Sequence, residues 1–455
     1  MKRYLIILAF SCLVVSGKSQ SLPTKTEVIK TMKKVNDYWI STNTDPGDNK
    51  WARAAYFTGN MSFYHVYPLQ EYLDYAVLWA NNHQWGLNRG TTTRIADDQC
   101  IGQTYIDLYL LGASTDTYKL NDITLSIQNM VNSTKSNDWD WIDAFYMAMP
   151  VFTRLGVLYD DSSYFDKMFA LYSDTKYSRS LFNITDGLWY RDQNYDPPYL
   201  TPNGLNCYWS RGNGWVMGGL ARTLQYLPLT DAHRDDYVTT FKLMATALKN
   251  TQRTDGFWNV SLIDPNDYGG PETSGTGFFT YSIAWGVNNG LLDSAEYVPV
   301  VLKAWNGLVS IAVHSDGKVG YIQGPGKEPS SAQPVDYDSN SDFGVGAFLL
   351  AGSEIVKLAS GELPVLTGVQ GDIVADTKIS VYPNPVRNTL KINSRFNMDT
   401  DLKTEVYTLQ GKKIYESPFG ETFPLQIDVS SYIPGIYLVK MISGGKCFVK
   451  KIVKE

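Results

Sequence analysis

The sequence predicts an all-α fold of paired helices arranged as a toroid, followed by a small C-terminal β-sandwich. Residues 24–359 repeat an amphipathic stretch of helical period and then a loop rich in Gly, Asn, Asp and Pro. From residue 378 onward, polar and apolar residues alternate in short runs separated by turn residues, which is the period of half-buried strands. A solenoid is the alternative for the helical part, but the chain shows no strict sequence period.

The N-terminus has the pattern of a signal peptide over residues 1–19. A short basic start precedes the apolar stretch 5–15, which is too short to span a bilayer. The small residues Gly17 and Ser19 stand where a signal peptidase cleaves, before Gln20. We therefore expect a secreted protein, and no later segment has the length of a membrane span.

The first domain, residues 20–358, is expected to consist of long helices. Helical stretches are predicted at 69–81, 100–111, 141–155, 164–175, 214–226, 234–251, 275–288, 297–311 and 342–358. Residues 359–376 have no helical period and are expected to be a linker. Within the final domain, 377–455, strands are predicted at 379–382, 390–392, 405–407, 436–440 and 447–449.

Charge and composition exclude some partners and favour others. The formal net charge of the 455 residues is −6 and there is no long basic run, so nucleic acid and anionic membrane surfaces are not expected partners. The 12 Trp, 31 Tyr and 18 Phe suit either a sugar-binding cleft or an aromatic-rich helical core, and composition does not separate the two. The four histidines are scattered without metal-ligand spacing, so no metal site is expected.

Candidate acids stand at two predicted helix starts. Asp97 and Asp98 lie where a loop enters a helix, and either carboxylate alone would be explained as a helix cap. Asp143 lies in the run WDWIDAFYMAMP (139–150), among aromatic and apolar side chains. Desolvation there is expected to raise the pKa of Asp143, so that it stays protonated and acts as a general acid. The alternative for Asp143 is again a cap.

A third motif is the run YWSRGNGW at 208–215. Trp209 and Trp215 offer stacking surfaces, and Arg211 offers a planar bidentate donor for a carboxylate. The two glycines of the run are expected to let the backbone approach a ligand closely. The alternative is that they shape a turn and that the tryptophans belong to the core.

These motifs together resemble glycoside hydrolase family 105, the unsaturated rhamnogalacturonyl hydrolases, which is related to the unsaturated glucuronyl hydrolases of family 88. The resemblance rests on Asp97 five residues before Gly102, on WIDAFYMA at 141–148 and on WSRGNGW at 209–215, and it spans 24–358. It implies an (α/α)6 barrel with the active site at one mouth and no metal or organic cofactor.

The resemblance also implies a reaction and a set of roles. The general acid of the family matches Asp143, which would protonate C4 of a C4=C5 enol ether before water adds at C5. The second carboxylate of the family matches Asp97. The residues expected to hold the substrate are Trp141, Arg191, Trp209, Arg211, Asn213 and Trp215.

Two positions depart from the family pattern and bear on the substrate. Some members carry histidine where this chain has Asn132, and some carry one in the segment that ends here at Arg191. Arg191 is therefore expected to face the leaving sugar. Rhamnogalacturonan digests, which end in an unsaturated galacturonyl-rhamnose, are the first expectation because the family acts on them most often. Ulvan digests, with a sulfated rhamnose, are the alternative.

The C-terminal domain resembles the sorting domain of the type IX secretion system of Bacteroidetes. The motifs are VYPNP at 381–385, DVS at 428–430, PGIY at 434–437 and the basic ending KKIVK at 450–454. The resemblance implies the secretion machinery as a partner and a final location at the cell surface or in the medium. A carbohydrate-binding module is the alternative for this domain. For the whole chain, a conventional inverting glycosidase and a non-catalytic glycan-binding surface protein remain alternatives.

Overall fold

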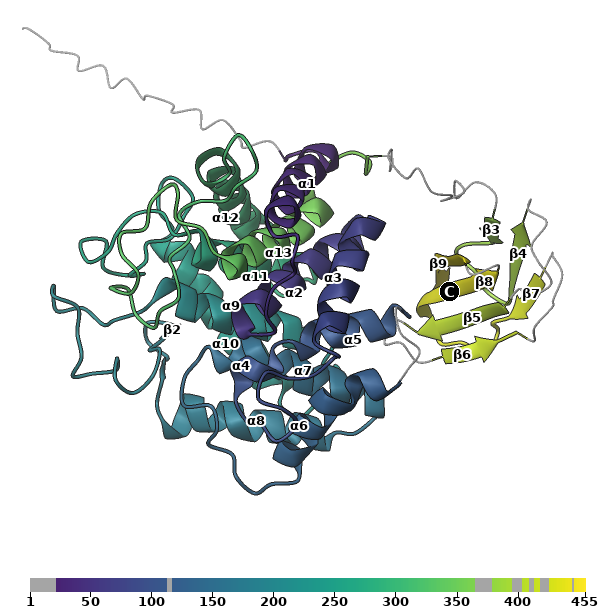
Figure 1. Ribbon diagram of the computed structural model, residues 1–455, viewed down its shortest axis with the longest axis horizontal. Helices are drawn as coiled ribbons and strands as arrows, with labels where there is room; N and C mark the ends of the chain where they lie inside the picture. The colour runs from purple at the N-terminus through teal and green to yellow at the C-terminus, as the bar shows by residue number, and fades with distance from the viewer. Residues whose placement is uncertain are drawn as a thin grey trace, which may run out of the picture.

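The computed structural model describes residues 22–112, 117–364, 379–394, 403–408, 413–417, 425–443 and 446–455 (Figure 1). The expected signal peptide lies outside these residues, and so does most of the expected linker. The described chain is helical as far as residue 358, with one short hairpin, and strand-rich from residue 379 onward.

The helices of the first part agree with most of the predicted stretches. They are α1 Lys25–Thr42, α2 Trp51–Val66, α3 Gln70–Asn82, α4 Ala96–Gln99, α5 Gly102–Leu110, α6 Asn121–Val131, α7 Ala144–Tyr159, α8 Ser163–Ser173, α9 Ser210–Leu224, α10 Arg234–Thr251, α11 Thr273–Asn288, α12 Ser294–Gly307 and α13 Asp342–Leu358. The hairpin is β1 Phe182–Asn183 with β2 Leu188–Trp189. Seven of the nine predicted starts differ by one to four residues, and two of these bear on the site: α7 begins at Ala144 rather than at 141, and α9 begins at Ser210 rather than at 214.

Helices α2, α5, α7, α9, α11 and α13 form the inner layer of this part. In the order of their contacts, α2 packs on α13, α13 on α11, α11 on α9, α9 on α7, and α7 on α4 and α5, which return to α2. Every residue of α9 is buried, as expected for a helix surrounded by protein. Helices α1, α3, α8, α10 and α12 pack on the inner layer from outside. One hydrophobic core runs through the layer, from Val28 to Ala359.

Small residues allow the inner helices to lie close together. A Cβ on Gly59 of α2 would lie 2.3 Å from the carbonyl oxygen of Gly346 on α13, and a Cβ on Gly346 would lie 2.3 Å from that of Ala55. These are backbone atoms, so neither helix can give way without moving as a whole. The glycine pair therefore sets the distance between α2 and α13.

The inner helices also share a direction, which positions the site. The first residues of α2, α4, α9 and α13, and the residue before α7, all lie at the same cavity or contact a residue that lines it. Helix N-termini carry unpaired N–H groups and the positive end of the helix dipole. This end of the helical part is therefore suited to an anionic ligand.

The C-terminal part contains two antiparallel sheets. The first has the order β3-β4-β7 and the second β6-β5-β8-β9. Their strands are β3 Ile379–Tyr382, β4 Thr389–Ser394, β5 Lys403–Thr408, β6 Lys413–Glu416, β7 Leu425–Asp428, β8 Gly435–Ser443 and β9 Lys446–Lys454. A separate apolar cluster, including Val406, Ile427 and Val439, forms its core. The five predicted strands are present, and β6 and β7 are additional.

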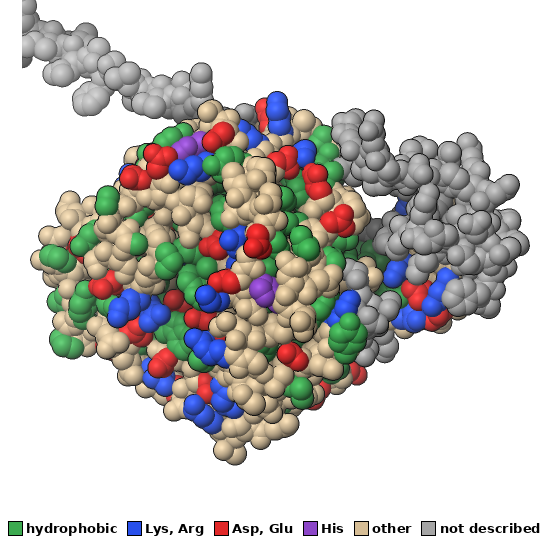
Figure 2. Space-filling model, in the orientation of Figure 1, with side chains coloured by type: hydrophobic (Ala, Val, Ile, Leu, Met, Phe, Trp, Pro, Cys, Tyr) green, Lys and Arg blue, Asp and Glu red, His purple; other side chains and the backbone are tan. Residues whose placement is uncertain are grey.

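The surface in Figure 2 carries basic and acidic side chains scattered over the helical part, singly and in small groups. The described part of the chain also contains exposed ion pairs, such as Lys33 with Asp37 and Lys50 with Asp48. Such a distribution gives no field of a single sign on this face. Within the ranges that the structure describes, no helix combines the length and the apolar character needed to cross a membrane.

Candidate active site

A cavity of about 140 Å³ lies at the N-terminal ends of the inner helices. Seven of the eight predicted site residues line it, the exception being Asn213. The lining residues are Trp51, Asp97, Trp141, Asp143, Met147, Arg191, Trp209, Arg211, Trp215 and Gly326. The cavity thus combines two carboxylates, two guanidinium groups and four tryptophans, which is a set suited to an acidic sugar.

Asp143 is the residue before α7, but it does not act as a cap. Its side chain accepts no hydrogen bond from the first turn of the helix, and its Oδ1 atom is buried without a hydrogen-bond partner among the described residues. Burial raises the pKa of Asp143, while the charges of Arg191 and Arg211 oppose that rise. The carboxyl is therefore unsatisfied, partly desolvated and directed at the cavity, as a general acid requires.

The neighbouring acids Asp97 and Asp98 have different surroundings. Asp98 accepts hydrogen bonds from Arg89 at 2.9 and 3.0 Å and from the Thr93 hydroxyl at 2.6 Å, so its carboxylate holds the loop. Asp97 lines the cavity and accepts no hydrogen bond from any residue in the described part of the chain. Burial, with the negative charges of Asp143 and Asp98, raises the pKa of Asp97 to about 7. Their position before a helix did not separate these two roles, whereas the family resemblance pointed to Asp97.

Arg191 reaches the cavity because its backbone is paired with the segment before α7. The amide of Ile142 donates to the carbonyl of Arg191 at 3.0 Å, and Trp141 forms an antiparallel bridge with Asp192. Nη2 of Arg191 then lies 3.5 Å from Oδ2 of Asp143, and Nη1 lies 2.6 Å from Oδ2 of Asp192. Arg191 was expected to face the leaving sugar, and the structure also places it beside the candidate acid.

Arg211 is buried in the first turn of α9, and its guanidinium contacts two backbone carbonyls and two aromatic rings. Its Nη1 and Nη2 atoms donate to the carbonyls of Gln323 at 2.6 Å and Gly324 at 2.7 Å. The guanidinium also lies over the rings of Trp209, at 4.5 Å, and Phe343, at 4.7 Å. Burial lowers the pKa of Arg211 to about 10, so the group remains charged at neutral pH. Its Nε atom has no partner among the described residues.

Gln323 fixes the loop that closes this side of the cavity. Its Oε1 atom accepts from the indole N–H of Trp209 at 2.8 Å, and its backbone amide donates to Glu272 at 3.2 Å. Its Nε2 atom donates to the carbonyls of Glu328, Pro329 and Ser331. Gln323 lies outside the motifs from which the candidate site was predicted.

Asn213 lies away from the cavity, contrary to its predicted place. Its Oδ1 atom accepts from the amide of Trp189 at 2.9 Å, and its Nδ2 atom donates to the carbonyl of the same residue at 3.0 Å. The amide therefore binds α9 to β2. The glycines of the motif also differ from expectation, since a Cβ on Gly214 would lie 3.3 Å from the Cα of Gly275. Gly214 therefore serves the packing of α9 against α11, whereas a Cβ on Gly212 would lie 2.9 Å from the ring of Trp209.

Three lining residues were not predicted, namely Met147, Trp51 and Gly326. Met147 is four residues after Asp143 on α7, so helical spacing places it on the same face, and this signal was available in the sequence. Trp51 is the first residue of α2 and contacts Trp215 edge to face, with ring centroids 6.0 Å apart. Its stretch of chain shows no motif, so only the fold reveals its place.

A second hollow of about 330 Å³ adjoins the cavity. It shares Trp141 and Arg191 with the cavity, and its other lining residues are Asp140, Arg179, Asp192, Gln193 and Asn194. A ligand in the cavity would therefore continue past the Trp141 and Arg191 side chains into this hollow. In the described ranges, no group of three or more His, Cys, Asp or Glu side chains is placed to hold a metal ion.

Comparison with known proteins assigns the helical part to a family. Residues 24–359 match the model of glycosyl hydrolase family 88. The chain belongs to this family. It is therefore a glycoside hydrolase, and the expected relationship to families 88 and 105 is confirmed. Residues 380–455 match the secretion system C-terminal sorting domain, which supports export to the cell surface or the medium.

Two curated relatives carry the same name, unsaturated 3S-rhamnoglycuronyl hydrolase. One, from Formosa agariphila, is 41% identical over 231 residues, covering 50% of this chain and 60% of the relative. The other, from Alteromonas sp. strain LOR, is 34% identical over 281 residues, covering 57% and 66%. The chain thus spans less than two thirds of each relative.

Solved structures give the same assignment. A family 88 hydrolase from Bacteroides vulgatus is 37% identical, with a TM-score of 0.69, covering 73% of this chain and 99% of the other. A protein described as a polysaccharide lyase is 39% identical, also with a TM-score of 0.69, covering 73% and 97%. A possible family 105 member from Salmonella enterica, 18% identical with a TM-score of 0.61 and covering 78% and 100%, shares the fold.

Proposed function

We propose that this enzyme removes a 4,5-unsaturated uronate from the end of oligosaccharides produced by polysaccharide lyases. One observation carries the proposal: Asp143 and Asp97 face the same cavity, and the pKa of each is raised. A carboxyl whose pKa is raised stays protonated at higher pH than an ordinary surface aspartate, so it can deliver a proton to carbon.

The reaction proceeds by hydration of the double bond. Asp143 gives its proton to C4, the π electrons of C4=C5 form the new C–H bond, and C5 is left as a cation shared with the ring oxygen. Water then adds to C5 and its proton returns to the Asp143 carboxylate, with Asp97 beside it as the second carboxyl. The hemiketal opens by breaking the bond from C5 to the ring oxygen, and the resulting hemiacetal at C1 releases the leaving sugar as an alcohol.

The uronate carboxylate is held by charge and by helix ends. Arg211 lines the cavity, its Nε atom has no hydrogen-bond partner among the described residues, and α7 and α9 begin beside the cavity. Trp209 and Trp215, both almost fully buried, supply flat faces against the ring. The small cavity suits a single sugar ring at the end of a chain, so we propose an exo-acting enzyme.

The leaving sugar occupies the second hollow, and we propose that it is a rhamnose sulfated at O3. The names of the two curated relatives favour this substrate over the galacturonyl-rhamnose expected first. The guanidinium groups of Arg179 and Arg191 border the hollow, and a sulfate oxygen accepts the same charge-assisted hydrogen bonds as a carboxylate.

The test is the ultraviolet absorbance of the conjugated double bond, followed in purified lyase digests. Loss of absorbance in ulvan digests, with little loss in rhamnogalacturonan digests, is the expected result. The reverse ranking would return the substrate to galacturonyl-rhamnose. A rise of absorbance with intact polysaccharide would indicate a lyase, as one similar structure is described. Release of saturated sugars without any absorbance change would indicate a conventional glycosidase.

The organisation proposed for the whole chain rests on the sequence pattern and on the contacts between the described helices and strands. The closed order of inner-helix contacts supports an (α/α)6 barrel over 20–358, and the two sheets with a shared apolar core support a sandwich over 377–455. Residues 1–19 are proposed as a signal peptide and 359–376 as a linker. Export then uses the type IX machinery, which would be tested by locating the protein in cells with and without residues 377–455.

A further inference from the structure

Arg191 stands at the junction of the cavity and the second hollow, between two carboxylates. Its Nη1 atom is paired with Asp192 at 2.6 Å, and its Nη2 atom lies 3.5 Å from Oδ2 of Asp143. Asp192 is itself held in place, because its Oδ1 atom accepts from the backbone and side-chain nitrogens of Asn194 at 2.8 and 2.7 Å. Together with the backbone pairing to Ile142, these contacts fix the guanidinium at a set distance from Asp143.

Two atoms at this junction lack partners. Nε of Arg191 and Oδ1 of Asp143 are both buried, and neither has a hydrogen-bond partner among the described residues. The ion pair at 3.5 Å is longer than a direct charge-assisted hydrogen bond, which is usually about 2.7–2.9 Å. Asp143 is therefore held within reach of a positive charge while one of its oxygens stays free for a proton that faces the substrate.

We propose that Arg191 is a positioning residue for the reaction: it sets how readily Asp143 releases its proton and stabilises the carboxylate that remains. The inference rests on the proposed function, and it assigns to Arg191 a role beyond contact with the leaving sugar. Asp143 must serve first as an acid toward C4 and then as a base toward water at C5. A fixed positive charge favours the first step, and its distance keeps the carboxylate basic enough for the second.

The charges that face Asp143 come from three further segments. Asp97 on α4 is negative and opposes ionisation of Asp143, and Arg211 on α9 is positive and favours it. From the segment after β2, Arg191 favours ionisation and Asp192 opposes it. Arg191 and Asp192 therefore have opposite effects on the same carboxyl, although they are adjacent in the chain and paired with each other.

Because Arg191 and Asp192 have opposite effects on the ionisation of Asp143, substitutions at the two positions should shift the pH profile in opposite directions. The pH dependence of kcat/KM is measured for wild type, Arg191→Gln, Arg191→Lys and Asp192→Asn, with the loss of double-bond absorbance as the readout. Two substrates are used: a lyase-derived oligosaccharide, and a phenyl glycoside of the unsaturated uronate, which has no sugar beyond the scissile bond. The phenyl glycoside removes every contact that Arg191 makes with a leaving sugar.

Loss of the positive charge raises the pKa of the acid, so Arg191→Gln is expected to move the alkaline limb to higher pH by about one unit. Arg191→Gln is also expected to lower the maximal rate several-fold on both substrates. Arg191→Lys keeps the charge and should restore at least half of the shift, and Asp192→Asn should move the limb to lower pH. All four proteins are compared only if their far-ultraviolet circular dichroism and thermal midpoints show that they are folded.

An Arg191→Gln enzyme that is impaired on the oligosaccharide but normal on the phenyl glycoside, with an unmoved limb, would leave Arg191 as a contact to the leaving sugar and overturn the inference. A shift of the alkaline limb to higher pH in Asp192→Asn would also overturn the inference. A wild-type enzyme that consumes neither unsaturated substrate would instead overturn the proposed function itself, so the two failures are distinguishable.

Discussion

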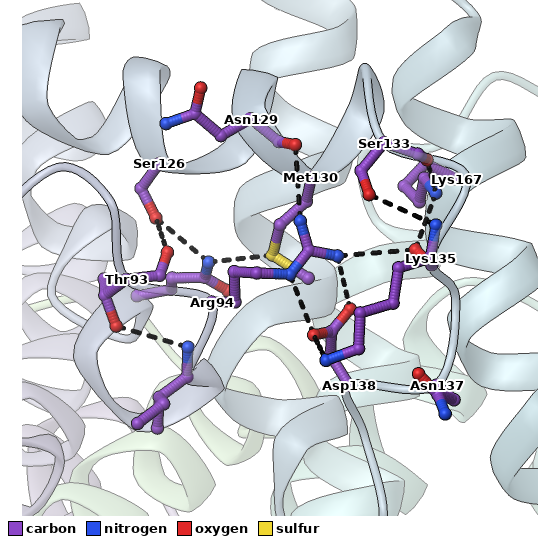
Figure 3. Close-up of polar contacts among 12 residues, drawn as sticks. Thr93, Arg94, Ser126, Asn129, Met130, Ser133, Lys135, Asn137, Asp138 and Lys167 are labelled. Carbon is purple, nitrogen blue, oxygen red and sulfur yellow. Dashed lines mark hydrogen bonds and ion pairs between the residues drawn. The ribbon is translucent and has the colours of Figure 1, made fainter.

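Arg94 binds Asp138 with both arms of its guanidinium, Nε at 2.8 Å and Nη2 at 2.6 Å, and this pair joins the segments that carry the two candidate carboxyls (Figure 3). Arg94 is three residues before Asp97, and Asp138 is five residues before Asp143. Lys135 adds a second cation to Asp138 at 2.8 Å. The geometry between the carboxyls therefore depends on an ion pair outside the cavity.

The first prediction concerns this ion pair. Asp138→Asn keeps the shape of the side chain but removes the charge that the guanidinium binds. Because hydrogen bonds to charged groups contribute about 1.5–3 kcal/mol, unfolding should become easier by about that amount. Small displacements of reacting groups have large effects on rate, so kcat should fall about tenfold or more. Urea denaturation and steady-state kinetics measure the two effects.

Lys33→Met, which removes surface ion pairs with Asp37 and Glu71, is the matched control and should change neither quantity noticeably. The pH dependence of the Arg94–Asp138 pair also has a definite sign. Burial would raise the pKa of Asp138, but hydrogen bonds from Arg94 and Lys135 outweigh it and the pKa is lowered. Its contribution to stability is present above the unfolded value of 3.8 and is lost as the pH falls through the lower folded value. Asp138→Asn should therefore lack this decrease in the free energy of unfolding as the pH falls.

The second prediction separates the adjacent acids Asp97 and Asp98. Asp97→Asn should lower kcat by about 100-fold or more while leaving the fold intact, because its carboxyl faces the cavity without a hydrogen bond from the described residues. Asp98→Asn should instead lower stability, because Arg89 and Thr93 lose a charged acceptor, and it should retain most of kcat. Paired kinetics and thermal unfolding decide the matter, and equal losses of kcat in the two variants would contradict the assignment.

Asp97 also gives a pH-dependent effect on stability. Its pKa in the folded state is raised from 3.8 to about 7, first by burial and then by the charge of Asp143. Its contribution is therefore fully present below the unfolded value and is lost as the pH rises through about 7. Above that pH, Asp97→Asn should be more stable than wild type, and the difference should vanish in acid. A variant that is less stable at alkaline pH would show that the carboxylate is satisfied in a way that the contacts do not reveal.

The sequence predicted the composition of the cavity because its chemistry is concentrated in short motifs. Asp143, Arg211 and the tryptophans stand in runs whose residue types are unusual together, and a resemblance assigned their roles. Helix positions followed from periodicity, but helix starts did not. The site lies at those starts, so Arg211 was expected in a loop and is in the first turn of α9.

Relationships across the fold were beyond the reach of the sequence. Trp51 is far from every motif in the chain and reaches the cavity only because α2 closes the inner layer against α13. Asn213 shows the reverse case, in which a motif residue binds the backbone of Trp189 and not the ligand. Both placements depend on contacts between residues that are far apart in the chain, and a local sequence pattern does not reveal such contacts.

A third prediction concerns the C-terminal part. The amide of Lys25 donates to the carbonyl of Ser360 at 2.8 Å, and the amide of Ser360 donates to Pro23 at 3.0 Å, so Ser360 belongs to the helical part. A chain that ends after Pro364 should keep kcat and KM unchanged and should no longer reach the cell surface or the medium. A chain that ends before Ser360 is the control and should unfold at a lower temperature. A folded but inactive protein ending after Pro364 would show that the sheets contribute to catalysis.

The last prediction concerns Arg211, whose guanidinium both holds a loop and faces the uronate. Lysine keeps the charge, but it cannot donate to Gln323 and Gly324 together while presenting another N–H to the cavity. Arg211→Lys should therefore raise the activation barrier by about 1.5–3 kcal/mol, which lowers kcat/KM roughly 10- to 150-fold.

Gln323→Glu is the matched variant. It disturbs the same loop without changing Arg211, because the side chain at 323 loses the N–H donors to Glu328, Pro329 and Ser331. If Arg211 binds the carboxylate, the methyl ester of the substrate should be a poor substrate for wild type and should discriminate less between wild type and Arg211→Lys. If Arg211 only supports the loop, both variants should lose the same factor on the acid and on the ester.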